Sequence, residues 1–172
     1  MDDALSPSPI TLRAALPDDV PVIRRFIRGL AEYERLPHEC VATEASLAST
    51  LFGDRPAAEV VLAFVNDQAA GFALFFQNYS TFLAQPGLYL EDLFVDPSFR
   101  GQGVGRALLA HLAAIAEARG CGRLEWSVLD WNAEAIAFYE KLGAQGMSEW
   151  TVHRVTGDAL ISLAAEGRAH VR

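Results

Sequence analysis

One segment, residues 88–106, limits the possible folds of this 172-residue chain more than any other. It begins with an apolar run, 88–95, whose aromatic and β-branched residues are typical of a largely buried strand. Pro97 ends the strand, because proline cannot donate to a β-ladder. Three glycines at alternate positions then lead into a helical pattern over 104–119. Glycine permits positive φ and close backbone approach, and a helix N-terminus favours an anion, so the segment predicts a pyrophosphate-binding turn.

Three kinds of phosphate-binding turn match this segment to different degrees. A P-loop requires Lys after its last glycine, but Arg106 follows Gly105, which excludes a P-loop. A dinucleotide-binding fingerprint needs G-x-G-x-x-G directly after the strand; here the glycines come later and are spaced G-x-G-x-G. This spacing weakens the dinucleotide alternative but does not exclude it, because Glu125 lies at about the distance onward that the fingerprint requires. The third pattern, Arg100-x-x-Gly103-x-Gly105, is present in full.

The rest of the chain alternates between strand and helix patterns, with no linker, repeat or low-complexity tract. Strands are predicted at 10–14, 59–65, 71–76, 88–95, 123–129 and 149–155, and helices at 20–31, 44–51, 104–119 and 132–142. This order predicts an α/β fold, a mixed sheet in one domain. The predicted domain spans 10–166, between an N-terminal tail (1–9) and a C-terminal tail (167–172).

Composition and charge restrict the function classes. The chain contains 14 Lys and Arg residues and 22 Asp and Glu residues, which gives a net charge of −8. This charge argues against general nucleic-acid binding and is compatible with a cationic substrate. No apolar run reaches membrane length, and the acidic, Pro- and Ser-containing start is unlike a signal peptide, so we expect a cytoplasmic protein without membrane contact. The two cysteines and four histidines have no metal-ligand spacing, and no metal is expected.

Several further segments carry a family resemblance. Together with the glycine turn, the chain resembles the GNAT superfamily of N-acetyltransferases, and within it the spermidine/spermine and thialysine N-acetyltransferase branch. The matching segments are Ile27–Glu34 (IRGLAEYE), Leu88–Asp92 (LYLED), Val128–Asn132 (VLDWN) and Phe138–Ala144 (FYEKLGA). The resemblance covers nearly all of residues 10–165. It implies a GNAT-type fold with a mostly antiparallel sheet flanked by helices, acetyl-CoA as co-substrate and a small amine as acceptor.

Acetylation of an amine requires that a proton be removed first, because an alkyl ammonium has a pKa of roughly 10 and only the neutral amine attacks a thioester. Glu91, on the strand before the glycine turn, is the candidate base, directly or through a water. Asp92 should point to the opposite face if the strand is regular. Alternatively, both acids are solvated or paired with arginines. The functional interpretation is favoured, because burying an unpaired carboxylate costs several kcal/mol.

Tyr139 is the candidate acid for the departing thiolate. A phenol with a pKa of about 10 can protonate a thiolate whose pKa is about 8.5 with little mismatch. By spacing alone, Tyr139 beside Phe138 would be a core aromatic of an amphipathic helix. The resemblance implies the acid role instead, since a tyrosine at this place serves as the acid in the family.

The resemblance also implies binding residues. The pantetheine arm would pair with the backbone of 93–95, which would also supply a donor to the thioester oxygen. Asn132 would contact the CoA arm and can also cap the following helix. The acetyl-CoA contacts so implied are Leu93, Phe94, Val95, Arg100, Gly101, Gln102, Gly103, Val104, Gly105, Arg106, Asn132 and Ala135. The substrate-side positions are Tyr33, Glu34, Glu91, Asp92 and Glu149, which as isolated residues would be ordinary surface.

One difference between this sequence and the branch bears on the identity of the acceptor. Its polyamine enzymes carry an acidic Asp-Pro-Trp segment where this chain has Ser80-Thr81-Phe82, so a partner for a distant ammonium is missing. The sequence therefore predicts acetyl transfer to the primary amine of a small lysine-like or diamine molecule, the thialysine type. Polyamine acetylation, acylation of protein lysines or N-termini, and a non-catalytic acyl-CoA-binding module remain as alternatives.

The C-terminal part predicts self-association. Residues 149–155 alternate in pattern and predict a last strand that carries Trp150 and two valines. An exposed strand of this kind is an association hazard for a monomer. The resemblance implies a homodimer whose C-terminal strands cross to the partner, with Glu149 near the amine site.

Overall fold

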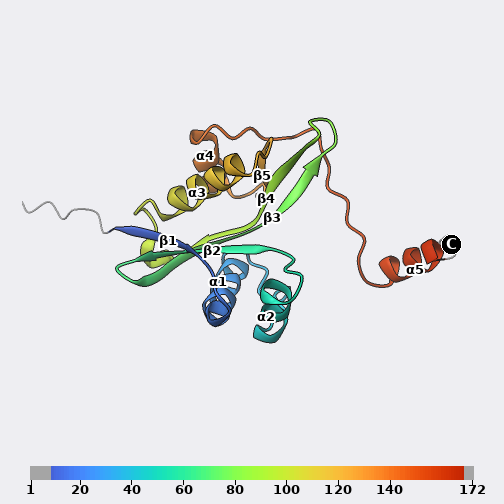
Figure 1. Ribbon diagram of the computed structural model, residues 1–172, viewed down its shortest axis with the longest axis horizontal. Helices are drawn as coiled ribbons and strands as arrows, with labels where there is room; N and C mark the ends of the chain where they lie inside the picture. Colours follow the sequence, from blue (N-terminus) through green and yellow to red (C-terminus); the bar gives the residue numbers. More distant parts are fainter. Residues whose placement is uncertain (1–8, 169–172) are drawn as a thin grey trace, which may run out of the picture. The chain divides into compact units, whose positions relative to one another are not determined.

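Most of the predicted elements are present in the computed structural model, which describes residues 9–168 (Figure 1). The predicted N-terminal tail lies outside these residues except for Pro9, and the predicted C-terminal tail lies outside them except for Gly167 and Arg168, which end the last helix. The chain divides into two compact units between Ser127 and Val128, and each is described by itself.

The first unit holds a five-stranded sheet in the order β1-β2-β3-β4-β5. Its elements are β1 (Ile10–Ala14), α1 (Val20–Tyr33), α2 (Glu44–Phe52), β2 (Glu59–Val65), β3 (Gln68–Ser80), β4 (Gln85–Val95), α3 (Val104–Ala118) and β5 (Leu124–Trp126), with short 3-10 turns at Pro17–Asp19 and Pro97–Phe99. The first three strand pairs are antiparallel and β4 pairs with β5 in parallel, which confirms the predicted mixed, mostly antiparallel sheet.

Local sequence signals fix several boundaries. Asn66 and Asp67 both adopt positive φ (49° and 61°) in the two-residue turn between β2 and β3, the conformation that matches the twist of a hairpin. The Thr43 hydroxyl accepts a 3.1 Å hydrogen bond from the backbone N–H of Ser46 and so caps α2. Gly120, with φ of 65°, follows the end of α3, where a left-handed residue satisfies the last carbonyls.

The β3–β4 hairpin is longer than the sequence predicts. Strands are predicted at 71–76 and 88–95, but the two strands pair until Ser80 meets Gln85, and only residues 81–84 turn. This part of the hairpin is only partly solvated: Tyr79 is 60% exposed, whereas Ser80 and Gly87 are buried.

The core lies on both faces of the sheet. Figure 1 shows α1 and α2 on one face and α3 on the other. On the α1 face, the ring of Phe26 lies 5.8 Å from that of Phe72 and 5.9 Å from that of Phe94, between ring centroids. On the α3 face, Leu108 and Leu112 are fully buried. These two layers hold β4 rigidly between helices, which matters because β4 carries most of the candidate site.

The second unit contains α4 (Ala133–Lys141) and α5 (Gly157–Arg168), joined by an extended connection. The prediction of a strand at 149–155 is wrong, because these residues pair with no strand among residues 9–168. Alternation alone does not make a strand when no neighbouring strand supplies a ladder. Trp150 (73%) and Val152 (81%) are both exposed. No helix in the described part of the chain is long and apolar enough to cross a membrane.

Candidate active site

The glycine turn between β4 and α3 is open to an incoming group. Gly101 and Gly103 adopt φ of 76° and 87°, and Gly103 is the N-cap residue of α3. A Cβ at Gly101 would meet no atom within 4 Å, and one at Gly103 would meet only the Ile10 Cδ1 atom, at 3.9 Å. No side chain caps the helix, so its first N–H groups face the open turn. The turn therefore has room for an anionic group bound by backbone N–H groups.

The turn is held by hydrogen bonds at its start. The Asp96 carboxylate accepts from the backbone N–H of Ser98 at 3.0 Å and from its hydroxyl at 2.7 Å. These bonds, chiefly that of the hydroxyl, hold the pKa of Asp96 below its usual range. Gln102 donates from Nε2 to the carbonyl of Ser98 at 3.3 Å. Val104 is buried, so only its backbone can contact a ligand, whereas the side chain of Arg106 is exposed.

The edge of β4 next to the turn has no strand partner within the first unit. β3 follows one edge of β4 as far as Val95, whereas β5 follows the other edge only over Leu88–Leu90. Residues 91–95 therefore present an open edge on the β5 side, where an extended ligand can add to the sheet. The expected pantetheine contacts, Leu93 to Val95, lie on this edge. The Phe94 side chain points into the core, so this residue can offer only its backbone.

A β-bulge at Glu91 interrupts β4. Leu90 pairs with Phe75 and Asp92 pairs with Leu74, which leaves Glu91 without a partner residue on β3. Adjacent residues Leu74 and Phe75 point to opposite faces, so Leu90 and Asp92 also point to opposite faces, although they are two residues apart. The expectation that Glu91 and Asp92 face opposite sides assumed a regular strand and is wrong, because the bulge brings both carboxylates toward the α1 face.

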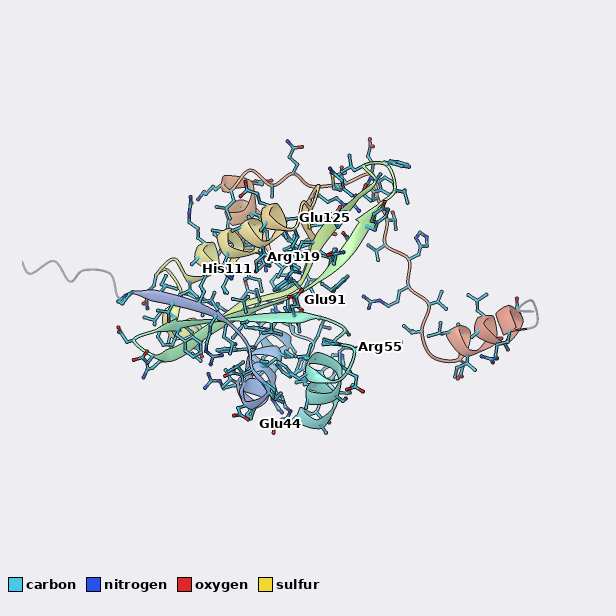
Figure 2. The ribbon with its side chains drawn as sticks, in the orientation of Figure 1. Glu44, Arg55, Glu91, His111, Arg119 and Glu125 are labelled. Atoms are coloured by element: carbon cyan, nitrogen blue, oxygen red, sulfur yellow. The ribbon has the colours of Figure 1, made fainter. Side chains whose placement is uncertain are left out.

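Three carboxylates gather at this bulge, two from β4 and one from the end of α1 (Glu91 is labelled in Figure 2). Asp92 is half-buried, and burial, followed by the charges of Glu91 and Glu34, raises its pKa to about 6. Burial also raises the pKa of Glu34. Glu91 itself is exposed. The group is therefore suited to accept a proton or to bind a cation, since a nearby ammonium would relieve the repulsion.

Arg100 turns toward α1. Its guanidinium carbon lies 4.8 Å from the ring centroid of Tyr33 and 5.9 Å from that of Phe94, and its Nε donates to the carbonyl of Val95 at 3.2 Å. It lines a cavity of about 470 Å³ with Arg25, Arg28, Gly29, Asp96 and other residues. The sequence did not single out Arg25 and Arg28; their spacing of one helical turn was the only available signal.

The second unit contains the remaining predicted residues. Asn132 caps α4, because its Oδ1 accepts a 3.2 Å hydrogen bond from the backbone N–H of Ala135. Tyr139 is half-buried on α4, and its ring centroid lies 5.4 Å from that of Phe138. Glu149 is exposed in the connection before α5. Among residues 9–168 no group of three His, Cys, Asp or Glu side chains is placed to hold a metal ion.

Comparison with known proteins identifies the family. The sequence model of the acetyltransferase (GNAT) family matches residues 27–144. The chain belongs to the GNAT acetyltransferase family. It is an acetyl-CoA-dependent N-acetyltransferase that acts on amines, and the predicted resemblance is confirmed.

Named relatives align with most of the chain. The L-ornithine N5-acetyltransferase NATA1 of Arabidopsis thaliana is 39% identical over 87% of this chain and 85% of its own length. The thialysine N-epsilon-acetyltransferase of Mus musculus is 37% identical over 89% of this chain and 96% of its own length. The human spermidine/spermine N(1)-acetyltransferase-like protein 1 is 32% identical over 90% of this chain but only 24% of its own length.

Solved structures agree on the fold. An integron cassette protein from the mobile metagenome of V. cholerae superposes with a TM-score of 0.76, at 29% identity over 90% of this chain and 97% of its own. A ribosomal-protein-alanine N-acetyltransferase from Brucella melitensis superposes with a TM-score of 0.68 at 20% identity, covering 87% of this chain and all of its own. The predicted GNAT-type fold is therefore confirmed.

Proposed function

We propose that this GNAT enzyme transfers the acetyl group of acetyl-CoA to the primary amine of a small lysine-like or diamine molecule, the thialysine type. The observation that carries the proposal is the group of three carboxylates at the β4 bulge, directly beside the open edge of the strand. An ammonium attracted by these carboxylates would come close to a thioester bound along 93–95. The names of the ornithine and thialysine relatives support an acceptor of this class.

Acetyl-CoA would bind along β4 and the glycine turn. The backbone of Leu93 to Val95 would pair with the pantetheine arm and offer an N–H to the thioester oxygen. The backbone of Gly101 to Gly105 and the first turn of α3 would hold the pyrophosphate, with Arg106 adding positive charge. Asn132 and Ala135, at the start of α4, are further proposed contacts. The positive φ of Gly101 and Gly103 and the open space beside them support this assignment.

Glu91 is the proposed base. Its exposed carboxylate takes one proton from the substrate ammonium, directly or through a water, and Asp92 and Glu34 hold the cation beforehand. The neutral amine then attacks the thioester carbon, forming the C–N bond. Tyr139 is the proposed acid: as the C–S bond breaks, its phenol gives a proton to the departing thiolate. The amide nitrogen loses its second proton, so each turnover releases the acetylated amine, CoA and one proton.

Polyamine acetylation is the second candidate, because the spermidine/spermine-like relative is also similar. Ser80, Thr81 and Phe82 occupy the tip of the β3–β4 hairpin, where Phe82 is 94% exposed and the turn residues 81–84 include no acid. A long polyamine would thus find no partner there for its distal ammonium. This difference supports the thialysine type over the polyamine type.

The proposed assembly is a homodimer in the cytoplasm. Large apolar side chains of the second unit are exposed in one chain, among them Trp150, Val152, Leu160, Ile161 and Leu163. A second copy of the chain would cover them, and the resemblance to dimeric enzymes points to the same assembly. Glu149 would then lie near an amine site.

A panel of amines tests the proposal by release of free CoA thiol. We expect turnover with L-ornithine, L-lysine, thialysine and short diamines, weaker turnover with spermidine and spermine, and none with peptides that contain lysine. Spermidine as the best substrate would establish the second candidate, and turnover of the lysine peptides alone would contradict both. Absence of any CoA release above the rate of hydrolysis would contradict the proposed function.

A further inference from the structure

The short strand β5 is held in the sheet by little backbone pairing and little burial. It pairs with β4 over only three residues, Leu88–Leu90 with Leu124–Trp126, and none of its own three residues is fully buried. It is the last strand of the sheet, so within residues 9–168 no strand follows its other edge. A short edge strand with these few contacts needs further interactions to fix its direction. Polar side chains supply them.

Glu125 of β5 takes part in a contact that spans three strands (Glu125 is labelled in Figure 2). Its Oε2 atom accepts a 3.1 Å hydrogen bond from Nδ2 of Asn78 on β3 and lies 2.8 Å from Nε of Arg123. β4 lies between β3 and β5, whose backbones are about 10 Å apart, so the side chains meet above β4. We call these three residues the cross-tie. In the sequence, Glu125 fitted only the acid of a dinucleotide fingerprint, whereas the structure gives its carboxylate two protein partners.

Gly87 of β4 leaves the space that the cross-tie occupies. Asn78 pairs with Gly87, and a Cβ at Gly87 would lie 2.2 Å from the Asn78 Oδ1 atom. This distance is far inside van der Waals contact, so a side chain at 87 would displace the amide. Because Nδ2 must face the Glu125 carboxylate, Oδ1 is turned away from it and is buried without a hydrogen-bond partner in the described part of the chain. A buried acceptor of this kind lowers stability, which indicates a role of the amide other than stability.

The cross-tie lies next to the point where β5 leaves β4, which we call the fork. The last pair of the two strands is Leu90 with Trp126, and the open edge of β4, 91–95, begins at the next residue. One further polar contact lies at the fork, where the hydroxyls of Tyr89 and Ser127 are 2.8 Å apart. All of these residues belong to the first unit. The direction in which β5 leaves the fork therefore sets the room beside the open edge.

We propose that the cross-tie positions β5 so that the pantetheine arm of acetyl-CoA fits along the open edge of β4. Asn78, Gly87 and Glu125 are then positioning residues: they act through the direction of β5 and do not touch the ligand. An extended ligand adds to a strand edge only where the neighbouring strand stays clear of it. This inference rests on the proposed function, in which the arm lies along 93–95 and the pyrophosphate at the glycine turn. Loss of the cross-tie should weaken binding of the arm and leave binding of the pyrophosphate unchanged.

Two ligands separate the arm from the pyrophosphate in calorimetry of the full chain. Acetyl-CoA carries the arm, and 3′-phosphoadenosine diphosphate is the same nucleotide without it. Glu125→Ala should weaken acetyl-CoA binding about 5- to 20-fold, part of the cost of a lost hydrogen bond to a charged group, and should change nucleotide binding by less than about twofold. Glu125→Gln keeps an oxygen acceptor for both donors and should retain most of the affinity. Equal weakening of both ligands, or of neither, would overturn the inference.

Glu59→Ala is the matched control. Glu59 is also paired with an arginine, Arg119, at 2.6 and 2.8 Å, but this pair joins the first residue of β2 to the residue after α3. Its loss should lower the stability to urea without changing the dissociation constant of either ligand. If Glu59→Ala weakens acetyl-CoA binding as much as Glu125→Ala does, general stability and not the position of β5 sets the affinity, and the inference is wrong.

A double-mutant cycle tests the place of the amide above Gly87. Asn78→Ala removes the amide and Gly87→Ala displaces it, so each should weaken acetyl-CoA binding to a similar extent. The double variant should bind no more weakly than either single variant, because the same contact can be lost only once. Additive losses would overturn the inference. Should Glu125→Ala fail to fold by circular dichroism, this cycle decides the question.

These measurements do not depend on the acceptor, so the two proposals can fail separately. If the variants lose acetyl-CoA affinity as expected but the wild type acetylates no amine, the cross-tie stands and the proposed reaction fails. If amines are acetylated and Glu125→Ala binds acetyl-CoA as tightly as the wild type does, the proposed reaction stands and the cross-tie has no part in it. A wild type that binds no acetyl-CoA would contradict both.

Discussion

Glu34 and Asp92 bring two carboxylates together at the contact between the end of α1 and the middle of β4. Burial is the largest cause of the raised pKa of Asp92, and the charges of Glu91 and Glu34 add to it. With a pKa of about 6, Asp92 is only partly ionised in mildly acidic solution. An ammonium would stabilise the charged form, so substrate binding should lower the pKa of Asp92 again.

Asp92→Asn should therefore stabilise the fold at alkaline pH. The pKa in the folded protein, about 6, lies above the ordinary value of 3.8, so the folded chain holds this proton more tightly than the unfolded chain. Below about pH 4 the carboxyl is protonated in both states and does not lower the free energy of unfolding. As the pH rises through 6, the carboxyl lowers the free energy of unfolding by an amount that reaches at most ~3 kcal/mol. Urea unfolding at pH 8 should show a gain of ~1–3 kcal/mol for the variant, which disappears at pH 4.

A second variant checks the origin of that gain. Asp92→Glu retains a titrating carboxyl at the same place, so the loss of stability on raising the pH should persist. If Asp92→Asn gives the same free-energy change at pH 4 and at pH 8, the effect is one of packing, and the electrostatic account of this site is wrong.

Local signals made much of the fold predictable. The turn at Asn66 and Asp67, the cap at Thr43 and the start of α3 at Val104 each depend on a few neighbouring residues, so the sequence alone determines them. The bulge at Glu91 was not predictable, because it exists only relative to the register of β3. The same limit applies to 149–155, where an alternating pattern was present but a pairing strand was not.

The site was predictable in part for a related reason. The glycine turn lies on consecutive residues, and its geometry follows from them. The arginine-lined cavity is formed by α1 and by a turn about 70 residues later in the chain. No sequence pattern indicates that Arg25 and Arg100 line the same cavity. The carboxylates of Glu34 and Asp92 were found through the resemblance, but their mutual repulsion appears only when α1 packs on β4.

Gly103→Val should abolish acetyl-CoA binding while the sheet survives. Valine in the left-handed region at φ of 87° is strained by roughly 1–2 kcal/mol, and its side chain would fill the space beside the helix start. Calorimetry with acetyl-CoA should detect no binding to the folded variant. Gly120→Val, at φ of 65° after the other end of α3, is a control of similar backbone strain that should bind normally. Unchanged affinity in folded Gly103→Val would remove the turn from the binding site.

Glu91→Gln should lose most of its turnover near neutral pH. The amide cannot accept the proton, so the rate should depend on the small fraction of substrate amine that is already neutral. That fraction rises toward the amine pKa of roughly 10, and the variant should partly recover in alkaline buffer. The measurement is kcat/KM for L-ornithine from pH 6 to 10. A profile parallel to that of the wild type would mean that Glu91 is not the base.

Tyr139→Phe should lower kcat by about 10²–10⁴ with little change in acetyl-CoA affinity, because only the proton donor is removed. The ring of the variant can still pack against that of Phe138, at 5.4 Å between ring centroids, so the melting temperature should change little. Phe138→Leu is the control for packing: it should lower stability more than it lowers the rate of a folded sample. Full activity in Tyr139→Phe would mean that water or another group, and not Tyr139, gives the proton to the thiolate.

The last prediction concerns assembly, and it depends on the connection between α4 and α5. Trp150, Val152 and Val155 are exposed in a connection that belongs to neither a helix nor a strand, and exposed apolar side chains of this size are costly for a monomer in water. Light scattering should give the mass of two chains. Replacing Trp150 and Val152 together by serine should shift the mass toward one chain, whereas Val41→Ser, an equally exposed valine of the first unit (84%), should not. A one-chain mass for the wild type would contradict the dimer.

If the mass is that of two chains, mixing inactive variants asks whether the sites are shared. Glu149→Ala and Tyr139→Phe would each be inactive alone. Should Glu149 act in the site of the partner, a mixed dimer holds one site with both residues intact, and up to about a quarter of wild-type activity should return after subunit exchange at equal concentrations. Sites built from one chain would gain nothing from mixing, because each chain would still carry one defect. The size of the recovered rate therefore decides between a dimer with composite sites and a dimer with two independent ones.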